Sequence, residues 1–173
     1  QGTSASSFVG LGWNGRNAPN ANSVWTASSP LLTPEKPVTL SWTAPNGAVY
    51  QLIVSIDDLY LFSVEQRVSN PTGQPIQVEP FSYSSRAGRS ADRSEWTVHV
   101  GPISVRNGEA DYNVDWETIR AAGANGLNFD PSSGWIGFTD KYWLTALAPR
   151  SATRKSFHYS PTGAYQASAI APA

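Results

Sequence analysis

Hydrophobic residues recur along the chain in short runs, and several runs alternate with polar residues as in half-buried β-strands. Val38, Leu40 and Trp42, for example, are separated by single hydroxyl-bearing residues. Turn sequences rich in Pro, Asn and Gly, such as Pro45-Asn46-Gly47, lie between the runs. The pattern predicts an all-β fold of mainly antiparallel strands, arranged as a sandwich or barrel, with at most one or two short helices.

The same reasoning gives the position of each element. Strands are predicted over residues 38–43, 49–56, 60–68, 76–83, 96–100, 103–105, 135–138, 142–147, 154–159 and 164–170. Asp115 to Ala122 favours one or two helical turns that end near Gly123. Residues 84–94 are predicted to form a mobile loop, and Pro80 suits a sheet edge or a bulge. We expect a single domain over residues 1–173, irregular over residues 1–23.

Composition narrows the class of protein. The chain has 173 residues, no cysteine and a formal net charge of −1, which excludes disulfides, thiolate metal sites and recognition of nucleic acid through bulk charge. No apolar run approaches the roughly 20 residues that span a bilayer. The chain begins at Gln1 and lacks methionine, so we expect it to be a piece of a larger protein.

Large aromatic side chains are densest in residues 133–149. The candidate cleft or interaction residues are four rings and one charged pair: Trp135, Phe138, Tyr142, Trp143, Asp140 and Lys141. Alternation in a strand places Trp135 and Phe138 on opposite faces, so the rings cannot all form one stacking platform. We interpret the segment chiefly as the structural centre of a β core, with one face open to a cleft. Asp140-Lys141 is predicted to be a solvated turn.

Two loop motifs have spacings that suggest ligand binding. Residues 10–15 match the glycine spacing of a dinucleotide site, but the sequence that follows opens no helix to hold a pyrophosphate. Asp111, Asn113 and Asp115 have the spacing of half a calcium loop, but Trp116 stands where that loop needs glycine. We therefore predict a plain loop and turn carboxylates, with no cofactor and no metal.

Catalytic residues are also not indicated. The chain has two histidines, His99 and His158, and no nucleophile-elbow sequence. Both are interpreted as ordinary strand residues. Distant carboxylates can still meet in a fold and hydrolyse glycosides, but nothing in the sequence selects a pair. We predict no catalytic residue.

Four segments resemble one known family. Gly134 to Trp143 resembles a signature of the large periplasmic domain of bacterial YidC-type membrane protein insertases, and residues 32–42, 56–62 and 99–105 are similar to the same domain in the same order. The resemblance implies a β-supersandwich like that of galactose mutarotases. It also implies a periplasmic location as part of a bacterial inner-membrane protein.

The function that this resemblance implies is non-enzymatic. The domain would assist the insertion and folding of inner-membrane proteins as a scaffold or docking surface, with Sec accessory proteins and nascent inner-membrane proteins as partners. It would meet the membrane only through parts of the protein outside this chain. The alternative from the residues themselves is a carbohydrate-binding or mutarotase-like module, since abundant Trp and Tyr in a β-rich chain can stack on sugars.

Overall fold

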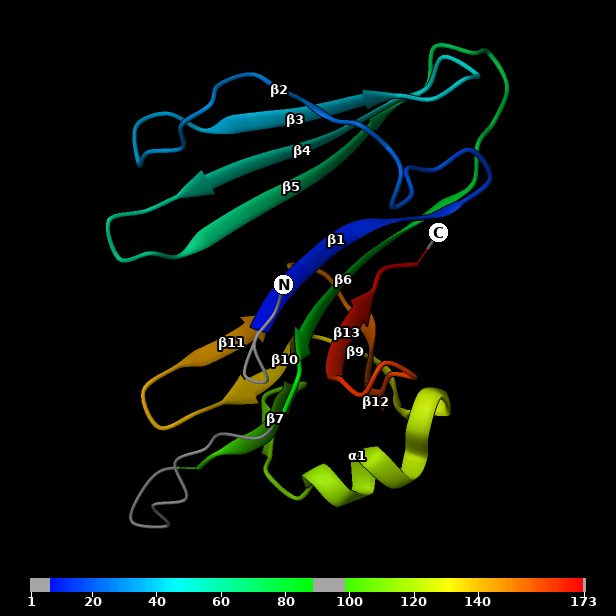
Figure 1. Cartoon of the computed structure of the whole chain (residues 1–173). Coiled ribbons are helices and arrows are strands. Elements are labelled where there is room, and N and C mark those ends of the chain that lie inside the picture. Colours follow the sequence, from blue (N-terminus) through cyan, green and yellow to red (C-terminus); the bar gives the residue numbers. More distant parts are fainter. Residues whose placement is uncertain (1–6, 89–98, 173) are drawn as a thin grey trace. The chain divides into compact units, whose positions relative to one another are not determined.

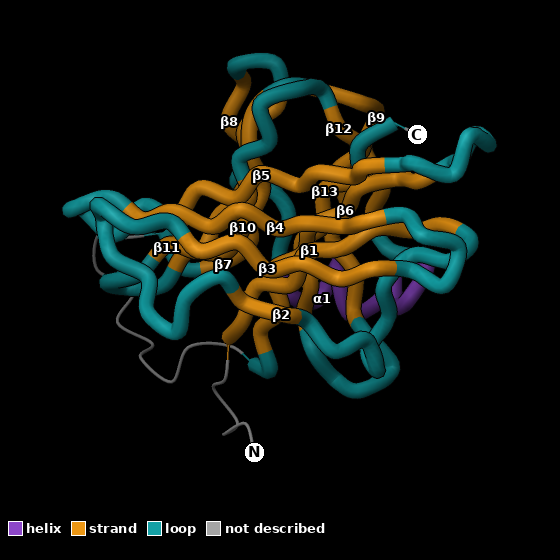
Figure 2. Tube along the Cα trace, turned by 90° about the horizontal axis from the view of Figure 1, so that it is seen from above, coloured by secondary structure: helices purple, strands orange, loops and turns teal. Residues whose placement is uncertain are grey.

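The computed structural model describes residues 7–88 and 99–172, which form antiparallel β-sheets and one short α-helix (Figures 1 and 2). The chain folds into two compact units. The larger unit comprises Gln1–Leu11 and Phe81–Pro172, and the smaller unit comprises Gly12–Pro80. The predicted all-β, mainly antiparallel fold class is confirmed. The prediction of one domain over the whole chain stays a prediction.

The larger unit contains two sheets and the helix. One sheet has the strand order β1-β6-β13-β12-β9, and the other has the order β11-β10-β7-β8. Their bounds are β1 Ser7–Gly15, β6 Val78–Arg86, β7 Gly101–Arg106, β8 Glu109–Asp111, β9 Leu127–Ser132, β10 Gly134–Thr139, β11 Leu144–Leu147, β12 Thr153–Tyr159 and β13 Tyr165–Ile170. The helix α1 covers Trp116–Ala122, and a single 3-10 turn, Gly123–Asn125, follows it. Strands β1 and β6 begin in one unit and end in the other.

The two sheets of the larger unit share one hydrophobic core. Ile136 and Phe138 of β10 are buried together with Phe157 of β12 and with Trp116 of α1. The Phe138 ring stacks on Trp116 at a centroid distance of 5.4 Å and lies 5.7 Å from Phe157. Fully burying each such side chain contributes about 1.5–3 kcal/mol. The predicted alternation in this strand is confirmed, because Ile136 and Phe138 face the core.

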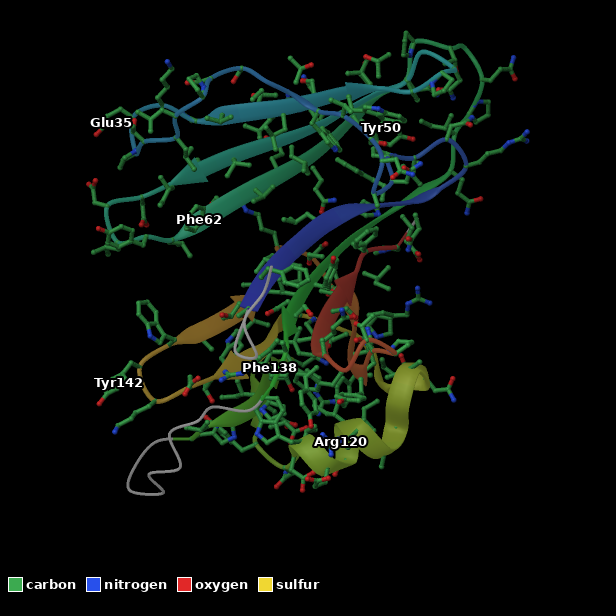
Figure 3. All side chains as sticks on the ribbon, in the orientation of Figure 1. Glu35, Tyr50, Phe62, Arg120, Phe138 and Tyr142 are labelled. Atoms are coloured by element: carbon green, nitrogen blue, oxygen red, sulfur yellow. The ribbon has the colours of Figure 1, made fainter. Side chains whose placement is uncertain are left out.

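The smaller unit is built on the sheet β2-β3-β4-β5. Its strands are β2 Thr26–Ala27, β3 Val38–Thr43, β4 Val49–Ile56 and β5 Phe62–Ser69. Tyr50 of β4 is buried at its centre, with the Trp13 ring 5.2 Å and the Trp42 ring 5.7 Å away (Figure 3). Burial raises the pKa of the Tyr50 phenol, since the charged form would lose its hydration.

The helix begins and ends as the sequence predicts. Asp115 is the N-cap, and its carboxylate accepts the backbone N–H of Thr118 at 2.7 Å. Gly123 ends the helix with φ 59°, a conformation that glycine adopts without a steric penalty. In the part of the chain that the structure describes, no helix is long and apolar enough to cross a membrane.

Three sequence predictions of secondary structure are wrong, and some strands were missed. Residues 7–15, expected to be irregular, form β1 beside β6. Residues 84–86, expected in a mobile loop, continue β6 and pair with β13. His99, expected in a strand, precedes β7, and residues 89–98 lie outside the described part of the chain. Strands β2, β8 and β9 were not predicted. Strands β1 and β9 pair with strands distant in the sequence, which outweighs their weak local alternation. Strands β2 and β8 have only two and three residues, too few to show alternation.

Pro80 lies within β6, directly before the six residues that pair with β13. The pairing of β6 with β13 begins only at Phe81, opposite Ile170. Pro80 therefore stands just before the first residue of that ladder, where its missing N–H costs no hydrogen bond to β13. The predicted edge position is wrong, because β6 lies between β1 and β13.

A buried lysine lies at an irregularity between β12 and β9, where the register shifts between Thr153 and Lys155. The Lys155 ammonium donates to the carbonyl of Ser132 and to the Thr153 hydroxyl, the latter at 3.2 Å. Its side chain is almost completely buried. Loss of hydration, and to a smaller extent the charge of Arg106, lowers the pKa of Lys155.

Replacement of Gly137 by alanine tests the close packing of β10 against β11. A Cβ atom at this position would overlap the Thr145 carbonyl oxygen and crowd the Ala146 Cα. We expect Gly137→Ala to lower the free energy of unfolding by about 1–3 kcal/mol, measured by urea denaturation. Gly101→Ala in the neighbouring strand is the control, because its Cβ would meet no atom closer than 3.4 Å. Equal stability of the two variants would contradict the packing described here.

Candidate functional site

The β10–β11 hairpin ends in a tip that presents aromatic residues to solvent; we call residues 140–144 the aromatic tip. Tyr142, Trp143 and Leu144 are 77%, 79% and 56% exposed. Figure 3 shows the Tyr142 side chain projecting from the end of this hairpin. The Asp140 N–H donates to the Trp143 carbonyl at 2.7 Å and closes the turn. The tip is therefore an ordered turn with an apolar surface.

The structure places the six predicted site residues in different environments. Asp140, Lys141, Tyr142 and Trp143 lie together in the aromatic tip, whereas Phe138 is in the core and Trp135 is half-buried in β10. The interpretation of the segment as a structural centre holds for Phe138 and is wrong for Tyr142 and Trp143. The physical reason is that strand alternation stops at Thr139, so it does not decide where the following rings point.

Asp140 forms an ion pair that the sequence did not indicate. The Arg86 guanidinium, at the end of β6, lies 2.5 Å from the Asp140 carboxylate, and the two side chains are only 13% and 21% exposed. The same guanidinium lies 5.8 Å from the centre of the Trp116 ring. The prediction of a solvated Asp140-Lys141 pair is therefore wrong for Asp140. This contact joins the base of the aromatic tip to β6 and α1.

His99, two residues before the start of β7, supports the same hairpin. Its Nδ1 lies 2.8 Å from the Thr139 hydroxyl, which is also 3.2 Å from both the N–H and the carbonyl of Gly101. The edge of the imidazole packs against Tyr112, at 5.3 Å between ring centres. Burial lowers the pKa of His99, because the charged imidazolium would lose hydration.

A second exposed tip connects β4 and β5 in the smaller unit; we call residues 57–62 the apolar tip. It carries four consecutive large hydrophobic residues. Their exposed fractions are 87% for Leu59, 82% for Tyr60, 65% for Leu61 and 59% for Phe62. Figure 3 shows Phe62 at the start of β5. Exposed apolar residues scattered singly are normal in proteins, but four in succession are not.

The apolar tip is held in one conformation by Asp57. The Asp57 carboxylate accepts the backbone N–H groups of Leu59 and Leu61, both at 2.9 Å. The Tyr60 N–H donates to the Asp57 carbonyl at 3.1 Å. Tyr60 has φ 62°, a left-handed conformation that costs of order 1–3 kcal/mol for a bulky residue. Strand β4 ends at Ile56 as predicted, and these hydrogen bonds order the turn that follows it.

Sequence reasoning missed the apolar tip as a candidate site, because Tyr60 was taken as the start of a strand. The missed signal is the run of four large hydrophobic residues directly after two aspartates. A half-buried strand would alternate polar and apolar residues there, and this run does not.

The other motifs serve the fold. Asp111 pairs with Arg106 at 2.6 Å, and a backbone hydrogen bond from Asn113 is the main cause that lowers the pKa of Asp111. His158, a strand residue as predicted, lies 2.6 Å from the Gln166 side chain. Within residues 7–88 and 99–172, no group of three or more His, Asp and Glu side chains is arranged to hold a metal ion.

Fold and tips together define an all-β domain that presents apolar and aromatic side chains on ordered hairpin turns. The chain matches the family of YidC periplasmic domains over residues 1–173 and belongs to that family. The predicted resemblance is thus confirmed, and so is the periplasmic location in an inner-membrane protein.

Relatives support the same assignment. The membrane protein insertase YidC of Zymomonas mobilis is 39% identical over 171 residues, which cover 96% of this chain and 30% of the relative. Those of Granulibacter bethesdensis and Beijerinckia indica are 38% and 32% identical, over 90% and 96% of this chain and 28% of each relative. This chain therefore spans less than a third of the length of these insertases.

Breaking the Arg86–Asp140 pair should destabilise the larger unit. Arg86→Gln removes the ion pair with the Asp140 carboxylate and the contact with Trp116. We expect the free energy of unfolding to fall by about 1.5–3 kcal/mol. Arg67→Gln is the matched control, because the Arg67–Glu65 pair is more than half exposed; its effect should stay below about 0.5 kcal/mol. A smaller loss for Arg86→Gln than for Arg67→Gln would contradict the assigned role.

His99 should make stability depend on pH. Its pKa in the folded chain is below the ordinary 6.5, so the unfolded chain binds more protons between these two values. Stability should therefore be complete above about pH 6.5 and should fall as the pH is lowered through the folded pKa. Urea denaturation across this range should show a weaker dependence for His99→Gln. Identical slopes for both proteins would rule out this contribution.

Proposed function

We propose that this domain is a non-enzymatic docking surface of a membrane protein insertase, and that its apolar tip contacts nascent inner-membrane proteins. The proposal rests on one observation, the four consecutive exposed hydrophobic residues on an ordered turn. It is supported by the relatives, whose name states that they insert membrane proteins.

The chemistry of the apolar tip fits such a partner. A segment bound for the bilayer is a run of about 20 apolar residues, which is poorly hydrated before insertion. Leu59, Leu61 and the two rings of the tip can remove part of that surface from water, at about 25 cal/mol per Å² of apolar area buried. Burial against a matching surface is the main driving force for such an association.

The ordered turn lowers the cost of binding. Because Asp57 already fixes the backbone of the tip, little conformational freedom is lost when a partner docks. Tyr60 has a left-handed backbone conformation, which tyrosine rarely adopts. Backbone strain of this kind concentrates at binding sites. Asp58, exposed beside the four hydrophobic residues, provides a polar rim.

Sec accessory proteins are the second proposed class of partner, with this domain as their scaffold. This part of the proposal rests on the family resemblance alone. The alternative of a carbohydrate-binding or mutarotase-like module is not favoured, because the relatives are named as insertases.

Site-specific photocrosslinking in the whole insertase tests the contact with nascent chains. A photoreactive phenylalanine analogue at Tyr60 should crosslink to a ribosome-stalled inner-membrane protein. The matched control is the same analogue at Gln74, which is exposed in the turn that follows the other end of β5. We expect a strong crosslink from position 60 and little from position 74.

A variant separates apolar contact from mere proximity. Leu59→Ser with Leu61→Ser keeps the backbone hydrogen bonds to Asp57 and removes the aliphatic groups. The crosslink from position 60 should then weaken severalfold. An equal crosslink from positions 60 and 74, or an unchanged crosslink in the serine variant, would refute the proposed docking role.

A further inference from the structure

The two tips differ in charge. The apolar tip contains Asp57 and Asp58, both exposed, and includes no basic residue. At the aromatic tip, the Asp140 carboxylate is paired with Arg86, and Lys141 follows it directly. The aromatic tip therefore carries a lysine, whereas the apolar tip carries no basic residue. A bilayer surface is lined with phosphates, so this difference makes the aromatic tip the better match to a membrane.

We propose that the aromatic tip of the larger unit inserts into the headgroup interface of a phospholipid bilayer. This goes beyond the docking of nascent proteins, and it differs from the expectation that the protein meets the membrane only outside this chain. The side chains that enter the interface are Tyr142, Trp143 and Leu144, with Lys141 directed to the lipid phosphates.

The exposed side chains are of the types that the interface favours. Tyr and Trp are enriched at membrane–water boundaries, because each joins an apolar ring to a polar group that stays hydrated. Leu144 adds a purely apolar side chain, and all three are more than half exposed. The Lys141 ammonium lies 5.2 Å from the centre of the Tyr142 ring. Its long aliphatic stem lets the charge reach phosphates while the rings lie deeper.

The hairpin is built to hold these side chains away from the core. Its two strands pair from Ile136↔Leu147 to Thr139↔Leu144. Arg86 fixes Asp140 at the base of the turn, and the Thr139 hydroxyl is bonded to Gly101 and His99. The rings are therefore already held in place before binding. Insertion then costs less conformational entropy, so more of its favourable free energy remains.

One tip binds weakly by itself, but the family places this domain in an inner-membrane protein. A tether to the membrane raises the local concentration of the bilayer, so a contact by a single hairpin suffices. The apolar tip contains two aspartates, so anionic headgroups would repel it. We therefore assign the apolar tip to protein partners.

The test is the depth of a label at position 143 in the whole insertase. This chain has no cysteine, so Trp143→Cys can carry a single bimane in a protein whose remaining cysteines are replaced. The labelled insertase is reconstituted in vesicles of phosphatidylethanolamine and phosphatidylglycerol, without any nascent protein. Quenching is then measured with lipids that carry a nitroxide near the top of the acyl chain.

We expect a blue-shifted bimane emission at position 143 and strong quenching by the nitroxide lipid. The matched control is Glu109→Cys, an exposed position at the start of β8 in the same unit, which should keep the emission of a label in water. A Tyr142→Ser change should reduce the quenching at position 143.

Equal quenching at positions 143 and 109 would overturn the proposal. A label at position 143 that becomes shielded only after a nascent protein or a Sec component is added would also overturn it, because the tip would then be a protein-binding surface. Since nascent chains are absent, this result does not depend on the crosslinking at Tyr60.

Discussion

The burial of Phe138 between two sheets and a helix is the constraint on which the larger unit depends. Its ring contacts Trp116 of α1 and Phe157 of β12 at the same time. The position of Phe138 determines which face of β10 packs against the core. It therefore also determines the direction in which the strand leaves the core. Asp140 comes only two residues later, so the geometry of the aromatic tip is set by the core and then secured by Arg86.

The domain treats similar side chains in two ways. Tryptophan and tyrosine fill both cores, at Trp116 and Tyr50, while Tyr60 and Trp143 stand in water at the ends of hairpins. Each exposed ring forgoes the stabilisation that burial would supply, and Tyr60 adds backbone strain. Proteins retain exposed aromatic residues and backbone strain where these contribute to binding. This connects the fold to the proposed contacts with nascent proteins and lipid.

Most of the fold could be predicted from the sequence. Individual strands and the helix show the physical reasons. Val38–Thr43 and Val49–Ile56 have the predicted bounds, because they alternate and are joined by a strong turn. Helix α1 was found through Asp115, which can cap without help from distant residues. Strand β1 was missed, because its pairing with β6 involves residues more than 60 positions away, and its own pattern is weak.

The candidate site was less predictable than the fold. Alternation decides which side of a sheet a ring faces, but it carries no information once the strand has ended, as at Tyr142 and Trp143. The partner of Asp140 lies 54 positions earlier in the chain, and no local pattern indicates it. Composition located the aromatic segment, whereas the run Leu59–Phe62 was hidden by the strong resemblance of any apolar run to a strand.

The chemical modification of Lys155 can report how often the larger unit opens. Besides this residue the chain contains only Lys36, which is exposed, and Lys141, which is half-exposed. An amine-acylating reagent would therefore reach Lys155 only when β9 separates from β12. The rate of that slow acylation would measure how often the sandwich opens, and whether a partner bound at a hairpin tip keeps it closed.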